Sequence, residues 1–320
     1  MPSTIGGAGS RPSHSGCVWQ CRVNQTMKMN MTQMNRTGKP SSPAGSFGGL
    51  TLSHARCLWV LSLLMVALCF GQAHADTTVS GPVSGTWTQT DSPYLVTGGL
   101  LVLPGNSLII QPNVQVRFQG PYVFEVDGIL QASGASNNPI VFTRANPAIA
   151  WNGIFFNGSS GSSLTYCQVY GSTNSGIRIT NGTAVLRDCV IANNSSRTSG
   201  GGVDASGGSG TLVLDKCVVT NNMLLRNPTT GGGGIALGGG NAEISRCLIA
   251  GNSTGTQPSY PGGGGILCYS GIATIDNAMI TNNACSAGYG GGVSVYGSHT
   301  EVRNCVVANN TCPAGGGGSF

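Results

Sequence analysis

The chain has 320 residues, of which 40% are hydrophobic, 8% are charged and 52 are glycine. This composition excludes an intrinsically disordered chain, which needs many charges and few apolar residues, and the glycines lack the three-residue period of collagen. The formal net charge of +5 arises in residues 1–75, which hold six Lys or Arg and no acid; residues 76–320 hold nine Lys or Arg and ten acids, and therefore have no basic bias for nucleic acid.

Residues 1–75 have the features of a long basic leader with an export signal. Arg56 precedes an apolar run at residues 58–70, and the small-x-small pattern Ala73-His74-Ala75 follows it. We expect cleavage after Ala75 and a secreted or cell-surface protein. The apolar run is short for a membrane span, so an uncleaved anchor is the alternative, and the mature region contains no candidate span. The true start is open, because the leader contains further methionines at Met27, Met29, Met31 and Met34.

Residues 76–94 have the composition of a polar lead-in, and residues 95–156 predict short strands separated by turns. Gly, Pro and Asn separate apolar or alternating runs at 100–103, 107–111, 114–118, 122–126 and 140–143. No window shows a sustained period of 3.6 residues, as an amphipathic helix would. The sequence therefore predicts an all-β fold.

The second half of the chain carries a degenerate repeat of about 27–31 residues. Five segments align without a gap: AVLRDCVIANN (184–194), LVLDKCVVTNN (212–222), AEISRCLIAGN (242–252), ATIDNAMITNN (273–283) and TEVRNCVVANN (300–310). Between them recur glycine runs that lead into Ile or Val, at 200–203, 232–235, 263–266 and 290–293. A fixed period of this size indicates stacked units, each of which buries its apolar face against the next.

The apolar residues keep one phase in every repeat, so equivalent side chains should stack in inward columns. The glycines suit corners that need a positive φ or no Cβ, and the Asn-Asn pairs suit a left-handed residue and side chains that hydrogen-bond from coil to coil. The pattern predicts a solenoid of short parallel strands. The expected columns are Leu186, Leu214, Ile244, Ile275 and Val302; Cys189, Cys217, Cys247, Ala278 and Cys305; and Ile191, Val219, Ile249, Ile280 and Val307.

Three stretches of the mature chain carry a family resemblance: GGLLVLPGNSLIIQPNVQVRF (98–118), VDGILQASGASNNPIVFT (126–143) and WNGIFF (151–156). They resemble the start of exported bacterial right-handed parallel β-helix proteins of the pectin-lyase-like fold. The repeats are similar to those of polymorphic outer-membrane proteins, although Gly replaces the Ala of their Gly-Gly-Ala motif and Val, Leu or Met the Phe of their Phe-x-x-N motif.

The resemblance covers residues 95–320 and implies a right-handed, single-stranded parallel β-helix of roughly eight or nine coils at a bacterial outer surface. Residues 315–320 (GGGGSF) start another coil. Because an open end would expose strand edges, we expect a cap, an anchor or a translocator beyond Phe320.

Many enzymes of this fold cleave polysaccharides, but their family motifs are missing from the sequence. Arg226-Asn-Pro228 lacks the second Arg of the lyase motif R-x-P-x-x-R, and the paired aspartates and His-Gly of the hydrolases are absent. Glu125 and Asp127 are the remaining catalytic candidates, because two carboxylates on one strand face could bind Ca²⁺ for a lyase or act as acid and base. The alternative is a solvated strand face, which needs no metal and no other cofactor.

Most other charges fall at the bend of the repeat. Arg187 lies one coil from Asp215, and Asp188 lies one coil from Lys216. We expect ion pairs between neighbouring coils at these positions, rather than a set of catalytic carboxylates.

The cysteines are of two kinds. Those of the inward column behave as small hydrophobes, since Ala278 replaces one of them, and without C-x-x-C spacing they predict no metal site. Cys285 and Cys312 each follow an Asn-Asn pair at the same offset, so we expect a disulfide bond between adjacent coils.

Tyr269 and Tyr296 each follow an inward residue of the strand after a glycine run, so they should point outward one coil apart. Stacked surface tyrosines could hold the face of a sugar ring. The alternative is a cross-strand aromatic pair that shields the wall of the solenoid.

The sequence thus predicts an exported scaffold without enzymatic activity, which presents a long face for adhesion or glycan binding. Its expected partner is a polysaccharide or a ligand on a host or cell surface. The alternative is a polysaccharide lyase or a glycoside hydrolase that uses Glu125 and Asp127. A third possibility is the passenger domain of a larger autotransported protein.

Overall fold

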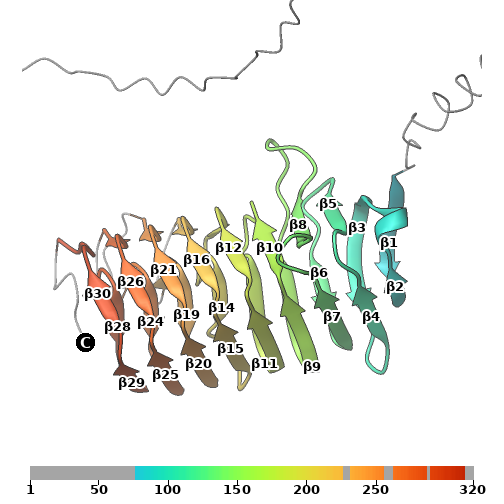
Figure 1. Cartoon of the computed structure of the whole chain (residues 1–320). Coiled ribbons are helices and arrows are strands. Elements are labelled where there is room, and N and C mark those ends of the chain that lie inside the picture. Colours follow the sequence, from blue (N-terminus) through green and yellow to red (C-terminus); the bar gives the residue numbers. More distant parts are fainter. Residues whose placement is uncertain (1–75, 226–230, 256–261, 287–288, 314–320) are drawn as a thin grey trace, which may run out of the picture. The chain divides into compact units, whose positions relative to one another are not determined.

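The structure is a computed structural model, and it describes residues 76–225, 231–255, 262–286 and 289–313. These residues form an all-β, right-handed parallel solenoid of about eight turns, as the sequence predicts (Figure 1). The one helical element among them is the short 3₁₀ helix η1 (Gln89–Asp91). The hypotheses about the leader, its cleavage after Ala75 and the coil begun at 315–320 concern residues outside the described ranges.

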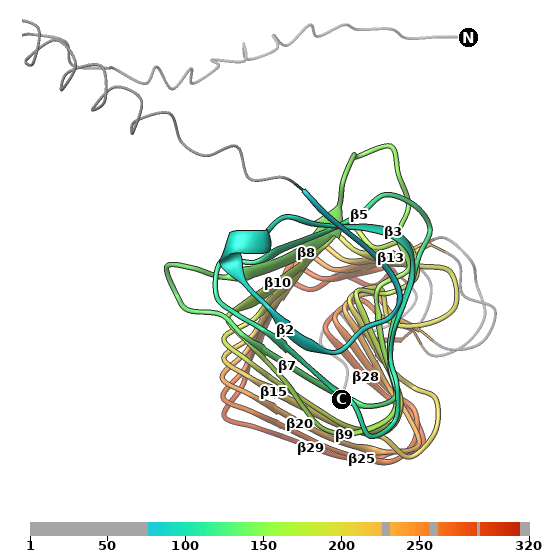
Figure 2. The same cartoon turned by 90° about the vertical axis from the view of Figure 1, so that its right-hand side faces the viewer.

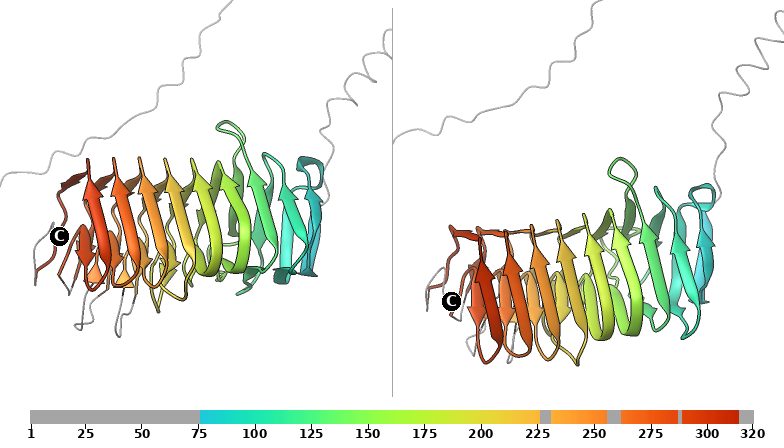
Figure 3. Two further views of the ribbon diagram at one scale, coloured as in Figure 1. Left: turned by 90° about the horizontal axis from the view of Figure 1, so that it is seen from below. Right: turned by 60° about the horizontal axis from the view of Figure 1, so that its bottom comes forward.

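Each coil contributes strands to three walls, in which equivalent strands of successive coils pair in parallel (Figure 3). Strands β9 (Ile154–Thr165) and β11 (Ile177–Arg187) turn a corner and belong to two walls. Seen along the stack, the coils lie over one another (Figure 2). Strands β1 (Thr77–Pro82) and β3 (Tyr94–Val102) also turn a corner and precede β5 and β6 in two of the walls. We name each wall by two of its strands.

The β6–β28 wall consists of β6 (Phe124–Val126), the first parts of β9 and β11, β14 (Val203–Ala205), β19 (Ile235–Leu237), β24 (Ile266–Cys268) and β28 (Val293–Val295). The β2–β29 wall consists of β2 (Gly85–Trp87), β4 (Ser107–Ile110), β7 (Ile129–Ser133), the last parts of β9 and β11, β15 (Thr211–Asp215), β20 (Asn241–Ser245), β25 (Ile272–Asp276) and β29 (His299–Arg303). The β5–β30 wall consists of β5 (Gln115–Phe118), β8 (Ile140–Arg144), β10 (Cys167–Tyr170), β12 (Val190–Ala192), β16 (Val218–Thr220), β21 (Leu248–Ala250), β26 (Met279–Thr281) and β30 (Val306–Ala308).

Residues 76–94, which the sequence predicts as a separate lead-in, form the first coil of the stack. β1 (Thr77–Pro82) pairs with β3 (Tyr94–Val102), and β2 pairs with β4. Trp87 at the end of β2 stacks on Tyr94, with 4.4 Å between the ring centroids. Because the prediction relied on repeats, it missed a coil that packs through aromatic rings instead.

The core changes in character along the stack. In the coils before residue 171, Phe118 stacks on Trp151 at 4.4 Å, and Phe124 lies 6.2 Å from Phe142. From Ile177 onward, the buried core of the described residues contains aliphatic residues, Ala and Cys but no aromatic ring. Strand pairing confirms the two predicted columns of Leu, Ile and Val residues position by position. The cysteine column also forms, and it starts one coil earlier than predicted, at Cys167.

The glycine runs lie where two backbone segments touch. Between the β5–β30 and β6–β28 walls, short strands of successive coils pair with one another. A Cβ on Gly233 would lie 2.4 Å from the carbonyl oxygen of Gly264 and 2.5 Å from that of Ser253. Glycine is therefore required at this position because a side chain would clash with the neighbouring backbone, and not because the backbone has a positive φ. The short strands are β13 (Ser195–Ser196), β17 (Met223–Leu224), β22 (Ser253–Thr254) and β27 (Ala284–Cys285) in one sheet, and β18 (Gly231–Gly232) and β23 (Gly262–Gly263) in another.

Candidate functional site

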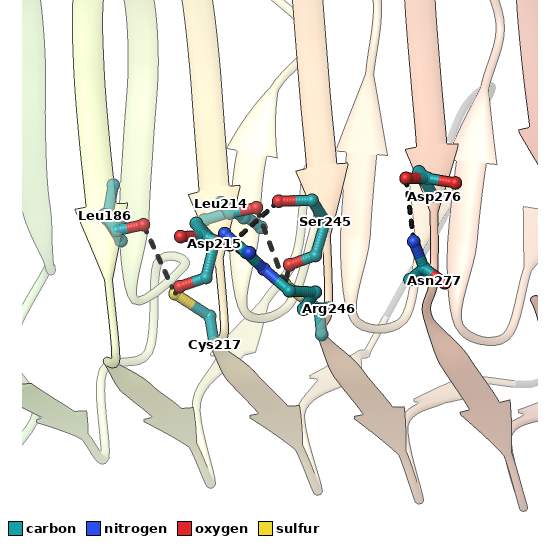
Figure 4. Close-up of polar contacts among 9 residues, drawn as sticks. Leu186, Leu214, Asp215, Cys217, Ser245, Arg246, Asp276 and Asn277 are labelled. Atoms are coloured by element: carbon teal, nitrogen blue, oxygen red, sulfur yellow. Dashed lines mark hydrogen bonds and ion pairs between the residues drawn. The ribbon is translucent and has the colours of Figure 1, made fainter.

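The bend between the β2–β29 and β5–β30 walls holds most charges of the repeats. Its second position takes a left-handed conformation, with φ of 53° at Lys216 and 55° at Arg246. Asp215 Oδ1 accepts hydrogen bonds from Ser245 Oγ at 2.9 Å and from Nε and Nη2 of Arg246 at 2.8 and 2.6 Å (Figure 4). Side chains of the bend therefore connect the coil of Asp215 to the next one, as those of Asp276 do with Arg303 and Asn304.

The partners in these ion pairs differ from the predicted ones. Within the described ranges, the carboxylates that pair with an arginine are Asp215 with Arg246, and Asp276 and Glu301 with Arg303. The predicted pairs Arg187–Asp215 and Asp188–Lys216 are therefore wrong. The left-handed bend points the Arg246 side chain back toward the preceding coil, where it reaches Asp215 diagonally.

Two carboxylates of the bend, Asp215 and Asp276, are hydrogen-bonded and have a lowered pKa. Burial acts to raise the pKa of Asp215, but the hydrogen bonds from Arg246 and Ser245 outweigh it and lower the pKa. The pKa of Asp276 is lowered mainly by the hydrogen bond from Asn304 Nδ2, at 3.0 Å, and also by the charge of Arg303. These groups stabilise the bend and do not have the raised pKa that a general acid needs at neutral pH.

An asparagine ladder runs through the corner after the β5–β30 wall. The first Asn of each pair is left-handed, as at Asn221 with φ 54°, and Gly251 takes its place once with φ 65°. The second Asn is buried and bonds to its copies. Nδ2 of Asn222 donates to Ile191 O at 2.9 Å and to Asn252 Oδ1 at 3.0 Å, while Asn222 Oδ1 accepts from Asn194. The ladder comprises Asn194, Asn222, Asn252, Asn283 and Asn310.

The inward cysteines are unsuited to nucleophilic or metal chemistry. Cys217 Sγ donates to Leu186 O at 3.5 Å and to Asp215 O at 3.4 Å (Figure 4). The stacked Cys189 thiol and burial raise the pKa of Cys217 to about 12, and the pKa of Cys247 is raised by the Cys217 thiol and burial. A thiolate is the reactive form, so these thiols serve as packing groups.

The backbone places Cys285 and Cys312 next to each other in adjacent coils. Their preceding residues Ala284 and Thr311 form a parallel bridge, and Cys285 N–H donates to Thr311 O at 2.8 Å. Adjacent strands lie within the Cα spacing that a disulfide requires. The disulfide between them stays a prediction that this register supports.

The four other predicted site residues all lie on the outer face of the β6–β28 wall. Two columns of residues that point away from the core run along it, separated by one inward residue. The first column consists of Leu101, Glu125, Phe155, Arg178, Asp204, Ala236, Leu267 and Ser294, of which the last three are buried. The second column lies two residues further along each coil, or three at Asn181 where the register shifts, and consists of Leu103, Asp127, Asn157, Asn181, Ser206, Gly238, Tyr269 and Tyr296.

The first coils of this wall carry carboxylates beside a stacked arginine. Glu125 Oε1 accepts a long hydrogen bond of 3.5 Å from Asn157 Nδ2, and Asp127 Oδ1 is buried without a hydrogen-bond partner. The guanidinium carbon of Arg178 lies 4.3 Å from the centroid of the Phe155 ring, a cation–π contact. Phe155 thus separates Glu125 from Arg178 in the first column.

The last coils of the wall carry the two tyrosines, which do not stack on each other. The Tyr269 ring lies over Gly238, where a Cβ would come within 2.3 Å of the ring, and its hydroxyl donates to Ser206 O two coils back. Tyr296 lies in the coil after Tyr269, whereas Gly238 lies in the coil before it, and Tyr296 is 62% exposed. The tyrosines therefore offer one anchored ring and one open ring.

Sequence reasoning missed two residues of this site, Phe155 and Asp204. Each occupies the position between two inward residues of the same strand, as Glu125 does. Aligning the strand after each glycine run with the earlier coils would have found them. Of the two arginines that the sequence offers as partners of Glu125 and Asp127, Arg178 lies on this wall, whereas Arg144 belongs to β8 on another wall and lies against Gly171.

Two hollows lie away from the β6–β28 wall. One of about 500 Å³ is formed by the first coils, and one of about 290 Å³ lies on the β2–β29 wall. The first is lined by Asp76, Gln89, Thr90, Ser92, Pro93, Asn113, Gln115 and Arg117. The second is lined by Glu243, Ile244, Ser245, Thr274, Asp276 and Arg303.

Two overlapping stretches of the chain, residues 96–249 and 152–319, match the family model described as "Right handed beta helix region". No curated protein and no solved structure matches the chain. In the part of the chain that the structure describes, no helix has the length and hydropathy to cross a membrane. The same residues contain no group of three or more His, Cys, Asp or Glu placed to hold a metal ion.

Proposed function

The chain belongs to the right-handed β-helix family, and from this premise we propose that it is an exported scaffold whose β6–β28 wall binds a glycan. It acts without catalysis, in secreted form or at the cell surface. The observation that carries this proposal is the register of the two outward columns, which places Glu125, Asp127, Tyr269 and Tyr296 on one face.

The spacing of the wall supports an elongated ligand. Adjacent strands lie about 4.8 Å apart, so the six steps from Asp127 to Tyr296 span roughly 29 Å. Hydrogen-bonding groups on the first coils and an open aromatic ring on the last are the two kinds of contact that a sugar polymer uses. The export part of the proposal is supported by the apolar run at 58–70 and the small residues before Asp76.

One observation favours a second candidate, a polysaccharide lyase or glycoside hydrolase. The buried, unpartnered Oδ1 of Asp127 lies close to a second carboxylate, Glu125, on the same wall. Against this, the nearest arginine of the wall stacks on Phe155 and makes no ion pair with either carboxylate. A lyase needs a base poised near the proton it removes, so this geometry favours binding over cleavage.

The test is binding and turnover measured together. The full chain, expressed with its leader, is incubated with a panel of plant, algal and bacterial polysaccharides, with and without Ca²⁺. Binding to at least one polymer without released reducing ends or unsaturated uronides supports the scaffold. Turnover of any polymer overturns it in favour of the enzyme, and a chain that is folded but binds nothing overturns glycan binding.

A matched pair of variants locates the surface. Tyr296→Ala removes the open ring of the wall, and we expect it to weaken binding by about tenfold, because one stacked aromatic contact contributes about 1 kcal/mol. Met279→Ala is the control, because Met279 is 49% exposed on the β5–β30 wall. Equal binding by both variants would place the ligand elsewhere.

A further inference from the structure

The β6–β28 wall has a net negative charge. Its charged residues are three carboxylates, of Glu125, Asp127 and Asp204, and one guanidinium, of Arg178, so its formal charge is −2. All four side chains are half-buried, and exposed charges that would screen them do not occur in either column. A polyanion laid along this wall would meet carboxylates, and therefore repulsion, on two of the four coils from Glu125 to Asp204.

Two of the three carboxylates keep an oxygen available. Asn157 binds only Oε1 of Glu125, and the backbone N–H and hydroxyl of Ser206 bind only Oδ1 of Asp204. Oδ1 of Asp127 has no partner either, but it is buried. A carboxylate oxygen is an acceptor that a sugar hydroxyl, as a donor, satisfies well.

The one positively charged side chain in the two columns, Arg178, already stacks on an aromatic ring. Arg178 lies over Phe155 at 4.3 Å and forms no ion pair with Asp204, its neighbour in the next coil, or with Glu125, which lies two coils back beyond Phe155. A site built for uronates or sulfates would present its arginine forks to the anion. Here the guanidinium and the ring instead form a flat surface between acceptors.

We propose that the β6–β28 wall selects a neutral glycan, whose hydroxyls donate to Glu125 and Asp204, and rejects acidic polysaccharides. The inference rests on the proposed glycan-binding function and names its ligand class. It also separates the scaffold from a lyase, since a lyase abstracts the proton next to a uronate carboxyl group and therefore requires an acidic polymer.

The test compares two sets of probes on the full chain. Neutral polymers are unsubstituted glucan, xylan, mannan and galactan; acidic polymers are polygalacturonate and alginate. We expect binding to at least one neutral polymer, unchanged between 0.05 and 0.5 M salt because the ligand carries no charge. Binding to the acidic polymers alone overturns this inference and leaves glycan binding standing, whereas binding to none overturns the proposed function itself.

The variant Glu125→Gln/Asp204→Asn tests the mechanism of selection. It keeps the shape of both side chains but weakens the acceptors, and we expect the affinity for the neutral polymer to fall about tenfold. Glu243→Gln is the matched control, an exposed carboxylate on the β2–β29 wall, and should bind as the parent does. Thermal unfolding checks that both variants are folded, and unchanged affinity in the double variant overturns the proposal.

Discussion

The coils before residue 171 and those after it share one backbone path but hold their interiors together in different ways. The earlier coils pack large rings, with Phe118 against Trp151 and Trp87 against Tyr94. The later coils pack small aliphatic residues and cysteines, and join them through buried asparagines. The same parallel solenoid therefore tolerates two kinds of core.

The difference explains why only one half of the chain shows a repeat. A ladder asparagine bonds to its own copies, so the next coil must supply the same residue at the same place. A stacked ring needs only a neighbour of complementary shape, so Trp151 and Phe118 need no counterparts in other coils. A repeat in this sequence therefore indicates hydrogen bonds between equivalent residues of successive coils, whereas the solenoid itself also forms where the sequence does not repeat.

The largest effect is expected in the aromatic half. Trp151→Ala empties the space beside Phe118 and removes the hydrogen bond from Nε1 to Tyr170 O, so the free energy of unfolding should fall by about 4 kcal/mol. Denaturant unfolding measures it. Trp151→Phe keeps a ring and should lose only about 1 kcal/mol. A loss below 1 kcal/mol for the alanine variant would contradict aromatic packing as the stabilising element.

In the repeat half, two neighbouring asparagines should respond oppositely to one change. Asn222→Gly leaves Ile191 O and the amide of Asn194 without partners and should cost about 3 kcal/mol. Asn221→Gly should be nearly neutral, because its φ of 54° suits glycine and Gly251 already occupies the equivalent place. Both are measured by denaturant unfolding, and similar losses would refute the ladder.

A single added methyl group should have different effects at two glycines, one taken from each half of the stack. Gly233→Ala brings Cβ within 2.4 Å of a neighbouring backbone oxygen and should destabilise the chain by about 2 kcal/mol. Gly99→Ala, in the early coils, meets nothing closer than 4.0 Å and should change stability by less than about 0.5 kcal/mol. Paired thermal unfolding curves test this, and equal shifts would show that the glycine runs are not required for close packing.

The thiol column should make the later coils sensitive to high pH. The folded chain raises the pKa of Cys217 from 9.0 to about 12, so it holds this proton more tightly than the unfolded chain does. Its contribution to stability is therefore complete below pH 9 and is lost as the pH rises toward 12. Denaturant midpoints measured from pH 8 to 11 should fall more steeply for the parent than for Cys217→Ala, and parallel slopes would contradict this.

The smallest effect belongs to the surface bend. Arg246→Gln removes an exposed ion pair with Asp215 and should lower the free energy of unfolding only slightly, because solvent screens the pair. Because the folded state lowers the pKa of Asp215, this difference from the parent should be complete above pH 4 and should vanish as the pH falls through the carboxyl pKa. A difference that persists at pH 2 would show that Arg246 acts through packing.

The sequence predicted the features that depend on repetition and missed those that depend on local geometry. The inward columns that contain Leu214 and Val219 can be predicted from the alternation of apolar residues in the aligned repeats alone, and the structure confirms them. The ion pairs at the bend were assigned to the wrong partners, because phase does not show that a left-handed residue turns Arg246 toward the preceding coil.

The candidate site shows the same limit. Alternation correctly placed Glu125 and Asp127 on one strand face, but the common wall that they share with Tyr269 emerges only from the register across five coils. The alternation of apolar residues could not show that the Tyr269 ring folds back over Gly238. This contact is possible only because the residue at that place in the preceding coil is a glycine and has no side chain.

The asparagine ladder also bears on how such a chain changes length over generations. Asn222 receives from Asn194 the same hydrogen bonds that it gives to Asn252. The two faces of a coil thus carry complementary hydrogen-bonding groups. Duplication or deletion of one whole repeat unit in the gene therefore leaves the asparagine hydrogen bonds between coils intact. Selection can then adjust the length of the binding face in steps of about 4.8 Å, with no redesign of the interior.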